Sequence, residues 1–170
     1  MVELRMKFGK GGGGLLLAHR KLNGLSGHEA GRQLLRQLYR EATGAPLPEI
    51  ATTPRGKPYL VGSDLHFSIS HTKHHAFCVL SSRPVGIDAE EMTRDISLKL
   101  AEKILSPSEK ARFAAAGDKR SALLKLWVLK EAAGKCSGEG INGYPTHTDF
   151  SPDDPRVQEM DGCYVAILEE

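Results

Sequence analysis

The chain has few of the features that mark several large classes of protein. It contains three cysteines, Cys78, Cys136 and Cys163, without C-x-x-C spacing, so neither a disulfide framework nor a zinc site is indicated. No apolar run approaches the ~18 residues of a membrane helix. The apolar segment after Lys10 is also shorter than the ~7–15 residues of a signal peptide. The net charge of +2 does not suggest a general nucleic-acid binder. We therefore expect a cytoplasmic protein with reduced thiols that binds neither nucleic acid nor a membrane.

Its length and residue pattern favour an α+β fold. The 170 residues suit one compact domain or two small halves, and the length favours a monomer. Alternating or apolar segments predict strands near 2–8, 15–19, 67–71, 76–80, 85–90 and 163–168. Capping boxes at Ser26–Glu29 and Ser106–Glu109 predict the starts of two helices. The glycines at 11–14 suit either a flexible turn, which we favour, or an anion-binding nest.

A third helix is predicted to run from about Ala122 to Cys136, apolar nearly all round except for a few charged side chains. A helix without a polar face is normally buried. At about 3.6 residues per turn, Trp127, Glu131 and Lys135 fall on one stripe, with Lys130 a quarter-turn away. This carboxylate and this ammonium could hold a metal and a phosphate in a cleft. The alternative is a helical ion pair that contributes about 0.3–0.5 kcal/mol.

A second acidic segment lies on the strand predicted around residues 85–90. Gly86, Asp88 and Glu90 share one strand face, opposite a face of apolar residues. Two carboxylates at this spacing repel each other unless a cation lies between them, and Gly86 would leave room for a ligand. Oxygen ligands without cysteine suit Mg²⁺, with Mn²⁺ as an alternative. The other interpretation is the acidic end of a strand that enters solvent.

Three further segments carry groups that can bind phosphate. Lys57 stands in a turn fixed by Gly56 and Pro58, although a plain surface turn is equally compatible with this pattern. The strand at 67–71 ends in Ser70 and His71, which can both donate hydrogen bonds to phosphate oxygens. Basic residues recur every four positions from 32 to 40 on the first helix, a pattern that more often marks a solvated face.

Together, the segments G-K-P, S-x-S-H, V-G-I-D-x-E and W-x-x-K-E-A-x-x-K occur in an order that resembles the 4′-phosphopantetheinyl transferases. The resemblance is to the surfactin-synthetase-activating type and covers roughly residues 26–150. It implies the fold of that family, an α+β fold of two similar halves in a pseudo-twofold arrangement. Residues 1–84 would form the half that holds the adenosine and 3′-phosphate of coenzyme A. Residues 85–170 would hold the metal and the catalytic helix.

The activity implied is that of a holo-[acyl-carrier-protein] synthase. A serine of an apo acyl or peptidyl carrier protein would attack the β-phosphate of coenzyme A in a Mg²⁺-dependent reaction. The 4′-phosphopantetheine arm would pass to that serine, and adenosine 3′,5′-bisphosphate would be released. Carrier proteins of this kind serve fatty acid, polyketide and nonribosomal peptide biosynthesis. We expect the carrier to contact apolar residues near Ile104 to Phe113.

The resemblance also implies roles for individual residues. Asp88, Glu90 and Glu131 would bind Mg²⁺, and Glu131 would also serve as the base for the attacking serine. Lys135 would contact the phosphate next to the pantetheine arm, and Lys130 would help to set the field of the site. The coenzyme A ligands would be Arg32 at the 3′-phosphate, Gly56, Lys57 and Pro58 at the adenosine, and Ser70 and His71 at the phosphates.

The chain departs from the family pattern at three positions. Ser68 stands where the family often has Asn, Ala89 replaces a bulkier apolar residue, and Gly134 precedes Lys135 in the predicted helix. Such a glycine costs up to about 1 kcal/mol of helix stability. Two other functions keep the pocket but change the chemistry. One is a non-catalytic module that binds coenzyme A or a carrier protein, and the other is a Mg²⁺-dependent phosphohydrolase.

Overall fold

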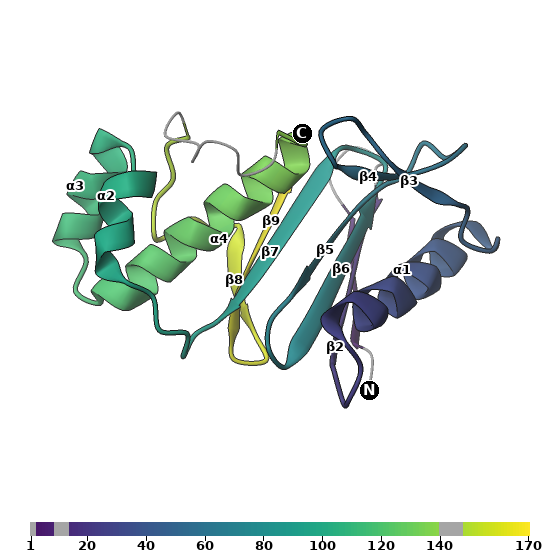
Figure 1. Ribbon diagram of the computed structural model, residues 1–170, viewed down its shortest axis with the longest axis horizontal. Coiled ribbons are helices and arrows are strands. Elements are labelled where there is room, and N and C mark those ends of the chain that lie inside the picture. The colour runs from purple at the N-terminus through teal and green to yellow at the C-terminus, as the bar shows by residue number, and fades with distance from the viewer. Residues whose placement is uncertain (1–2, 9–13, 140–147) are drawn as a thin grey trace.

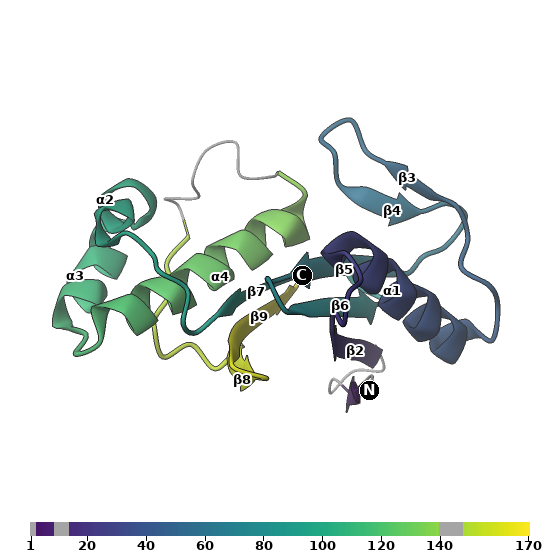
Figure 2. The same cartoon turned by 60° about the horizontal axis from the view of Figure 1, so that its bottom comes forward.

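The computed structural model describes residues 3–8, 14–139 and 148–170. Figures 1 and 2 show its strands and helices from two directions. In chain order these elements are β1 (Glu3–Phe8), β2 (Gly14–Lys21), α1 (Gly27–Thr43), β3 (Ile50–Thr52), β4 (Pro58–Leu60), β5 (His66–His71), β6 (His75–Ser81), β7 (Val85–Glu91), the 3₁₀ turn η1 (Leu98–Leu100), α2 (Ala101–Ile104), α3 (Pro107–Ala115), α4 (Lys119–Ser137), β8 (Val157–Met160) and β9 (Cys163–Glu169).

The first half of the chain forms an antiparallel sheet covered by one helix. Its strand order is β1-β2-β6-β5. Helix α1 begins at the predicted capping box of Ser26 and Glu29 and ends at Gly44, whose φ of 71° is the left-handed conformation that glycine favours. Leu34, Leu35 and Leu38 of α1 pack against this sheet in one core cluster.

The second half forms a smaller antiparallel sheet, of order β7-β9-β8, beneath the longest helix. Helix α4 packs on β7 and β9, while α2 and α3 lie at its N-terminal end (Figure 1). Its apolar side chains are buried on the side of the sheet and on the side of the short helices, as the apolar pattern predicts. Gly138, with φ of 73°, ends the helix where the sequence predicts.

The two sheets meet along their edge strands β5 and β7. Side chains from both sheets, among them Phe77 and Val79 of β6 and Ile87 of β7, form one further core cluster between them. The α+β class is therefore confirmed, with strands of the first sheet drawn from residues 3–81 and those of the second from residues 85–169. The two sheets differ in strand number and helical cover, and a pseudo-twofold relation between the halves stays a prediction.

Several local predictions are confirmed and others are wrong. The second capping box, Ser106 with Glu109, starts α3, and all three cysteines are free and buried. The predicted strands omit β3 and β4, which form a two-stranded sheet around the Gly56 turn. The predicted glycine turn at 11–13 lies outside the described residues. Among the described residues, no helix has the length and apolar character needed to cross a membrane.

Candidate active site

The acidic face of β7 lies directly against α4. A Cβ atom at Gly86 would collide with the carbonyl oxygen of Ala132 and the backbone nitrogen of Cys136. Gly86 therefore serves the close approach of helix to strand, and the prediction that it leaves room for a ligand is wrong. Because the helix backbone comes this close, Glu131 and Lys135 of α4 reach the same region as Asp88 of β7.

Asp88 is the point where three elements converge. Its Oδ1 accepts a hydrogen bond from Lys135 Nζ of α4 at 2.7 Å and one from Ser70 Oγ of β5 at 3.0 Å. Lys135 Nζ also donates to the carbonyl oxygen of Ile87 at 3.1 Å. The structure thus brings together Asp88 and Lys135, two residues predicted to act in one site.

Glu131 lies beside this pair in an environment that disfavours its charge. Burial and, next, the negative charge of Asp88 raise the pKa of Glu131 to about 7, with Lys135 partly opposing them. A carboxyl group with a pKa near neutrality can accept a proton at physiological pH. The environment of Glu131 therefore suits a general base, the role that the family resemblance implies for it.

Glu90, the third predicted metal ligand, pairs with a neighbouring arginine. The guanidinium of Arg94 forms an ion pair with the Glu90 carboxylate and lies 5.7 Å from the centre of the Trp127 ring. Burial raises the pKa of Glu90, and the charge of Arg94 only partly offsets this. Asp88 and Glu90 are thus each paired with a positively charged side chain of the protein, Lys135 and Arg94 respectively.

The three carboxylates supply the right chemistry for a hard cation. Asp88 raises the pKa of both Glu90 and Glu131, and a divalent cation among the three would remove that repulsion. In the described part of the chain, however, no three His, Cys, Asp or Glu side chains are grouped as a ready set of metal ligands. Lys135 and Arg94 would have to share the oxygens of Asp88 and Glu90 with the metal.

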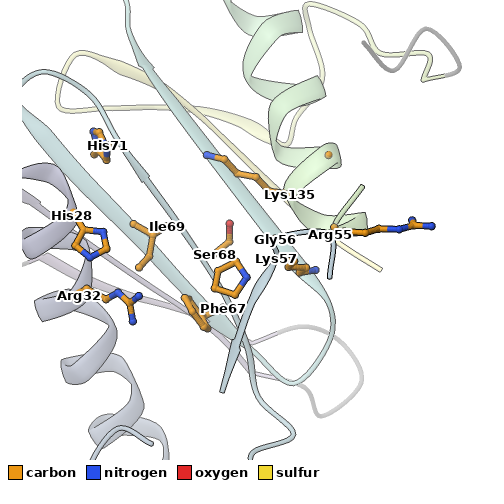
Figure 3. A pocket seen from close by; sticks show the side chains of 13 residues that line it. His28, Arg32, Arg55, Gly56, Lys57, Phe67, Ser68, Ile69, His71 and Lys135 are labelled. Carbon is orange, nitrogen blue, oxygen red and sulfur yellow. The ribbon is translucent and has the colours of Figure 1, made fainter. Parts of the chain in front are cut away.

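A pocket of about 370 Å³ opens beside this cluster (Figure 3). It is bounded by α1, the β3–β4 turn, β5 and the C-terminal end of α4. The ionisable side chains that line it are all basic: His28, Arg32, Arg55, Lys57, His71 and Lys135. Figure 3 shows His28 and Arg32 on one side of the pocket, Lys135 on the other and Ile69 of β5 between them. A pocket with this lining is suited to a ligand that carries several negative charges.

Most of the residues predicted to bind coenzyme A line this pocket, namely Arg32, Gly56, Lys57, Pro58 and His71. Lys57 Nζ donates a hydrogen bond to the carbonyl oxygen of Cys136 near the end of α4, and its side chain packs against Gly138. The β3–β4 turn is therefore fixed to the helix that carries Glu131 and Lys135. The ring of His71 lies against the start of α1, where a Cβ atom on Gly27 would collide with it.

Two predicted site residues lie elsewhere. Lys130 is buried on the far side of α4, where its Nζ lies 2.7 Å from the Glu109 carboxylate and 2.9 Å from Thr148 Oγ1. Lys130 therefore does not line the pocket, and its predicted role, to help set the field of the site, stays a prediction. Ser70 is also buried, with its hydroxyl bonded to Asp88 and to the backbone nitrogen of Ala89, and it does not line the pocket.

The sequence analysis missed two basic residues of the pocket, His28 and Arg55. His28 stands four residues before Arg32, and that spacing puts two side chains on one face of a helix. This signal was present, but His28 was considered only as part of the capping segment. Arg55 precedes Gly56 in the turn, and its side chain points away from the other labelled residues in Figure 3.

The segment that contains β7 and α4 has known counterparts. Residues 84–163 match the family model described as the 4′-phosphopantetheinyl transferase superfamily. This half of the chain belongs to that superfamily. The match spans the acids of β7, all of α4 and the start of β9. The resemblance inferred from the sequence motifs is confirmed.

Relatives of the superfamily give the same result. The chain is 36% identical over 88 residues to the 4′-phosphopantetheinyl transferase gsp of Aneurinibacillus migulanus, covering 51% of this chain and 36% of that protein. It is 32% identical over 117 residues to the transferase psf-1 of Bacillus pumilus, covering 66% and 50%. It is 31% identical over 122 residues to the transferase HetI of Nostoc sp., covering 66% and 52%. The chain thus spans about half or less of the length of these relatives.

Proposed function

We propose that this protein transfers the 4′-phosphopantetheine arm of coenzyme A to a serine of an apo acyl or peptidyl carrier protein. The observation that carries the proposal is the position of the basic pocket beside the Asp88, Glu131 and Lys135 cluster. The pocket suits the phosphates of coenzyme A, and the cluster suits attack on the phosphate at its inner end. The names of the relatives support this chemistry.

The pocket would bind coenzyme A through its basic lining. Arg32 would contact the 3′-phosphate, and Gly56, Lys57 and Pro58 would hold the adenosine. His71 lines the pocket and directly follows Ser70, which bonds to Asp88, so it would contact the diphosphate. On this basis we assign residues 1–84 to the adenosine and 3′-phosphate side. Residues 85–170 would form the side of the metal and the catalytic helix.

In the transfer step, the carrier serine oxygen would bond to the β-phosphorus of coenzyme A. The bond from that phosphorus to the bridging oxygen would break, and adenosine 3′,5′-bisphosphate would leave with the electron pair. Glu131 would take the serine proton, with its pKa near 7 in the metal-free protein lowered by the bound divalent ion. Lys135 would neutralise charge that develops on the β-phosphate, since its side chain lies at the edge of the pocket.

Asp88, Glu90 and Glu131 would hold Mg²⁺, or Mn²⁺, at the junction of β7 and α4. A bound divalent ion supplies charge stabilisation across the phosphates of the transition state.

The carrier would dock on the open side of the cluster. Ile104 and Leu105 are fully buried in the core, so they cannot form the predicted carrier surface. We propose that the protein acts as a cytoplasmic monomer.

Mass spectrometry of a carrier protein tests the function directly. The chain would be incubated with coenzyme A, Mg²⁺ and an apo-carrier protein, and the carrier and nucleotide products would be weighed. A carrier that gains the mass of the phosphopantetheine arm supports transfer. An unmodified carrier with intact coenzyme A would instead support a binding module. Cleaved coenzyme A with an unmodified carrier would support a phosphohydrolase.

A further inference from the structure

The junction of the two sheets has an unusual hydrogen-bond pattern. β5 and β7 are edge strands of different sheets, and an edge strand leaves backbone groups that need partners. Two serine hydroxyls of β5 serve β7 here: Ser68 Oγ accepts from Ile87 N and Ser70 Oγ accepts from Ala89 N, both at 3.1 Å. Both partners advance by two residues, so the strands run in the same direction.

Ser70 makes a second bond that distinguishes it from Ser68. Its hydroxyl donates to Asp88 Oδ1 at 3.0 Å. A serine hydroxyl has a single proton, and the lone pair that faces Ala89 N fixes the direction in which this proton points. Since Ser70 and Asp88 are both buried, the loss of this bond would leave a polar group without its partner.

The Asp88 carboxylate is therefore held from two sides. Lys135 Nζ approaches Oδ1 from α4 at 2.7 Å, and Ser70 Oγ approaches the same oxygen from β5. The lysine has a long, flexible side chain, whereas the serine is short and its hydroxyl is anchored to the backbone of β7. Of these two donors, Ser70 gives the more rigid constraint on the orientation of the carboxylate.

We propose that Ser70 is a positioning residue that sets the orientation of the Asp88 carboxylate for its ligand, and that it does not bind the phosphates of coenzyme A. The single proton of its hydroxyl cannot serve Asp88 and a phosphate at once. The consequence for metal binding and turnover rests on the proposed function. The orientation of Asp88 does not, because it follows from contacts within the chain.

Mg²⁺ binding by the purified full chain, measured by titration calorimetry without a carrier, tests this role. We expect Ser70→Ala to weaken Mg²⁺ binding by about tenfold, as the loss of a residue that orients a metal ligand commonly does. Ser70→Thr, which retains the hydroxyl, should recover most of the affinity. In turnover assays Ser70→Ala should lower kcat and leave KM for coenzyme A unchanged.

Ser68→Ala is the matched control, because it removes the equivalent bond to β7 but no bond to Asp88. Thermal unfolding should show a loss of stability for both alanine variants, larger for Ser70→Ala because it also loses the bond to Asp88, while only Ser70→Ala loses Mg²⁺ affinity. The comparison uses Mg²⁺ affinity rather than turnover because Ser68 also lines the pocket. Equal Mg²⁺ affinity in the two variants, or a raised KM for coenzyme A in Ser70→Ala alone, would overturn the proposal.

A crystal structure of metal-free Ser70→Ala separates this inference from the proposed function. We expect the Asp88 carboxylate to be rotated relative to the wild-type protein. An unchanged carboxylate would refute the positioning role even if the protein is an active transferase. A wild-type protein that modifies no carrier would refute the proposed function, while a rotated Asp88 in the variant would still support the role of Ser70.

Discussion

Helix α4 carries two lysine–carboxylate pairs that have the same N–O distance, 2.7 Å, but different surroundings. The side chains of Lys130 and Glu109 are 3% and 0% exposed, whereas those of Lys135 and Asp88 are 33% and 9% exposed. The first pair lies within the core beside α3, and the second lies at the edge of the basic pocket. Two lysines five residues apart on one helix thus lie in different surroundings, one in the core and one at the pocket.

The largest effect is expected when the buried pair is broken. Lys130→Met should destabilise the protein by about 3–5 kcal/mol, because it leaves the buried Glu109 without its counter-ion. Urea denaturation would measure this loss. The double variant Lys130→Met with Glu109→Gln should recover part of it, since it removes the unpaired charge and the amide oxygen of glutamine can still accept one of the two hydrogen bonds from Ser106 N and Phe150 N. A stable single variant that has lost transfer would instead place Lys130 in the chemistry.

The pair at the pocket should show the opposite behaviour. Lys135→Met and Asp88→Asn should each lower kcat for transfer by about 10²–10³-fold, because charge on the phosphate loses its stabilisation. Thermal unfolding should change little in Lys135→Met, since its side chain is one-third exposed. Lys125→Met, which removes another lysine of α4 that packs over Tyr164, is the control and should retain transfer. Full activity in Lys135→Met would rule out its proposed role.

Glu131 offers a third test, through the pH dependence of stability. Its pKa in the folded protein is about 7, against 4.5 as the ordinary value, so the folded state binds more protons between these pH values. The stability of the wild-type protein should therefore fall as pH rises through this window. Glu131→Gln should remove the part of the trend that Glu131 contributes, while Glu90, whose pKa is also raised, contributes a remainder of the same sign. The variant should be more stable than wild type at pH 8, by up to about 3 kcal/mol, and equal to it at pH 4.

Urea denaturation in the presence of a chelator, at pH values from 4 to 8, would measure the effect. The charges next to Glu131 predict how substitutions shift the pH at which stability changes. Asp88→Asn should move it to lower pH, and Lys135→Met should move it to higher pH, because these charges act on Glu131 in opposite directions. A stability difference between Glu131→Gln and wild type that does not depend on pH would show that Glu131 titrates normally.

The sequence predicted the parts of this site that depend on local structure. Capping boxes located the starts of α1 and α3, and strand alternation put Asp88 and Glu90 on one face of β7. The helical repeat also put Glu131 and Lys135 on one stripe. The motif order identified the superfamily, because four weak motifs in sequence are together specific.

Long-range packing decided what the sequence could not predict. The helical repeat gives the angle between Lys130 and Glu131, but only the fold puts Glu109 of α3 opposite Lys130. Gly86 suggested room for a ligand beside Asp88, but the backbone of α4 occupies that room. Ser70 suggested a phosphate ligand, yet β7 supplies its partners. In each case the residue type was informative, and the neighbouring element determined its role.

A third lysine extends the comparison to the β3–β4 turn and carries the smallest expected effect. Lys57 has two parts with separate contacts: its Nζ donates to Cys136 O, and its aliphatic stem packs on Gly138. Lys57→Met keeps most of the stem but removes the ammonium, whereas Lys57→Ala removes both. Calorimetry with coenzyme A should show a loss of affinity of about tenfold for Lys57→Met, the size expected when one charge-assisted hydrogen bond is lost.

The two variants distinguish a role of Lys57 in binding coenzyme A from a role in fixing the β3–β4 turn to α4. If the ammonium binds coenzyme A, both variants should lose affinity, and only Lys57→Ala should also loosen the turn, measured as faster hydrogen exchange at residues 53–60. Wild-type affinity in Lys57→Met would mean that the ammonium serves only the end of α4. Lys57 would then resemble Lys130, a structural lysine, rather than Lys135. Its place at the pocket would not make it a ligand, because its ammonium group would bond to the carbonyl oxygen of Cys136 and not to coenzyme A.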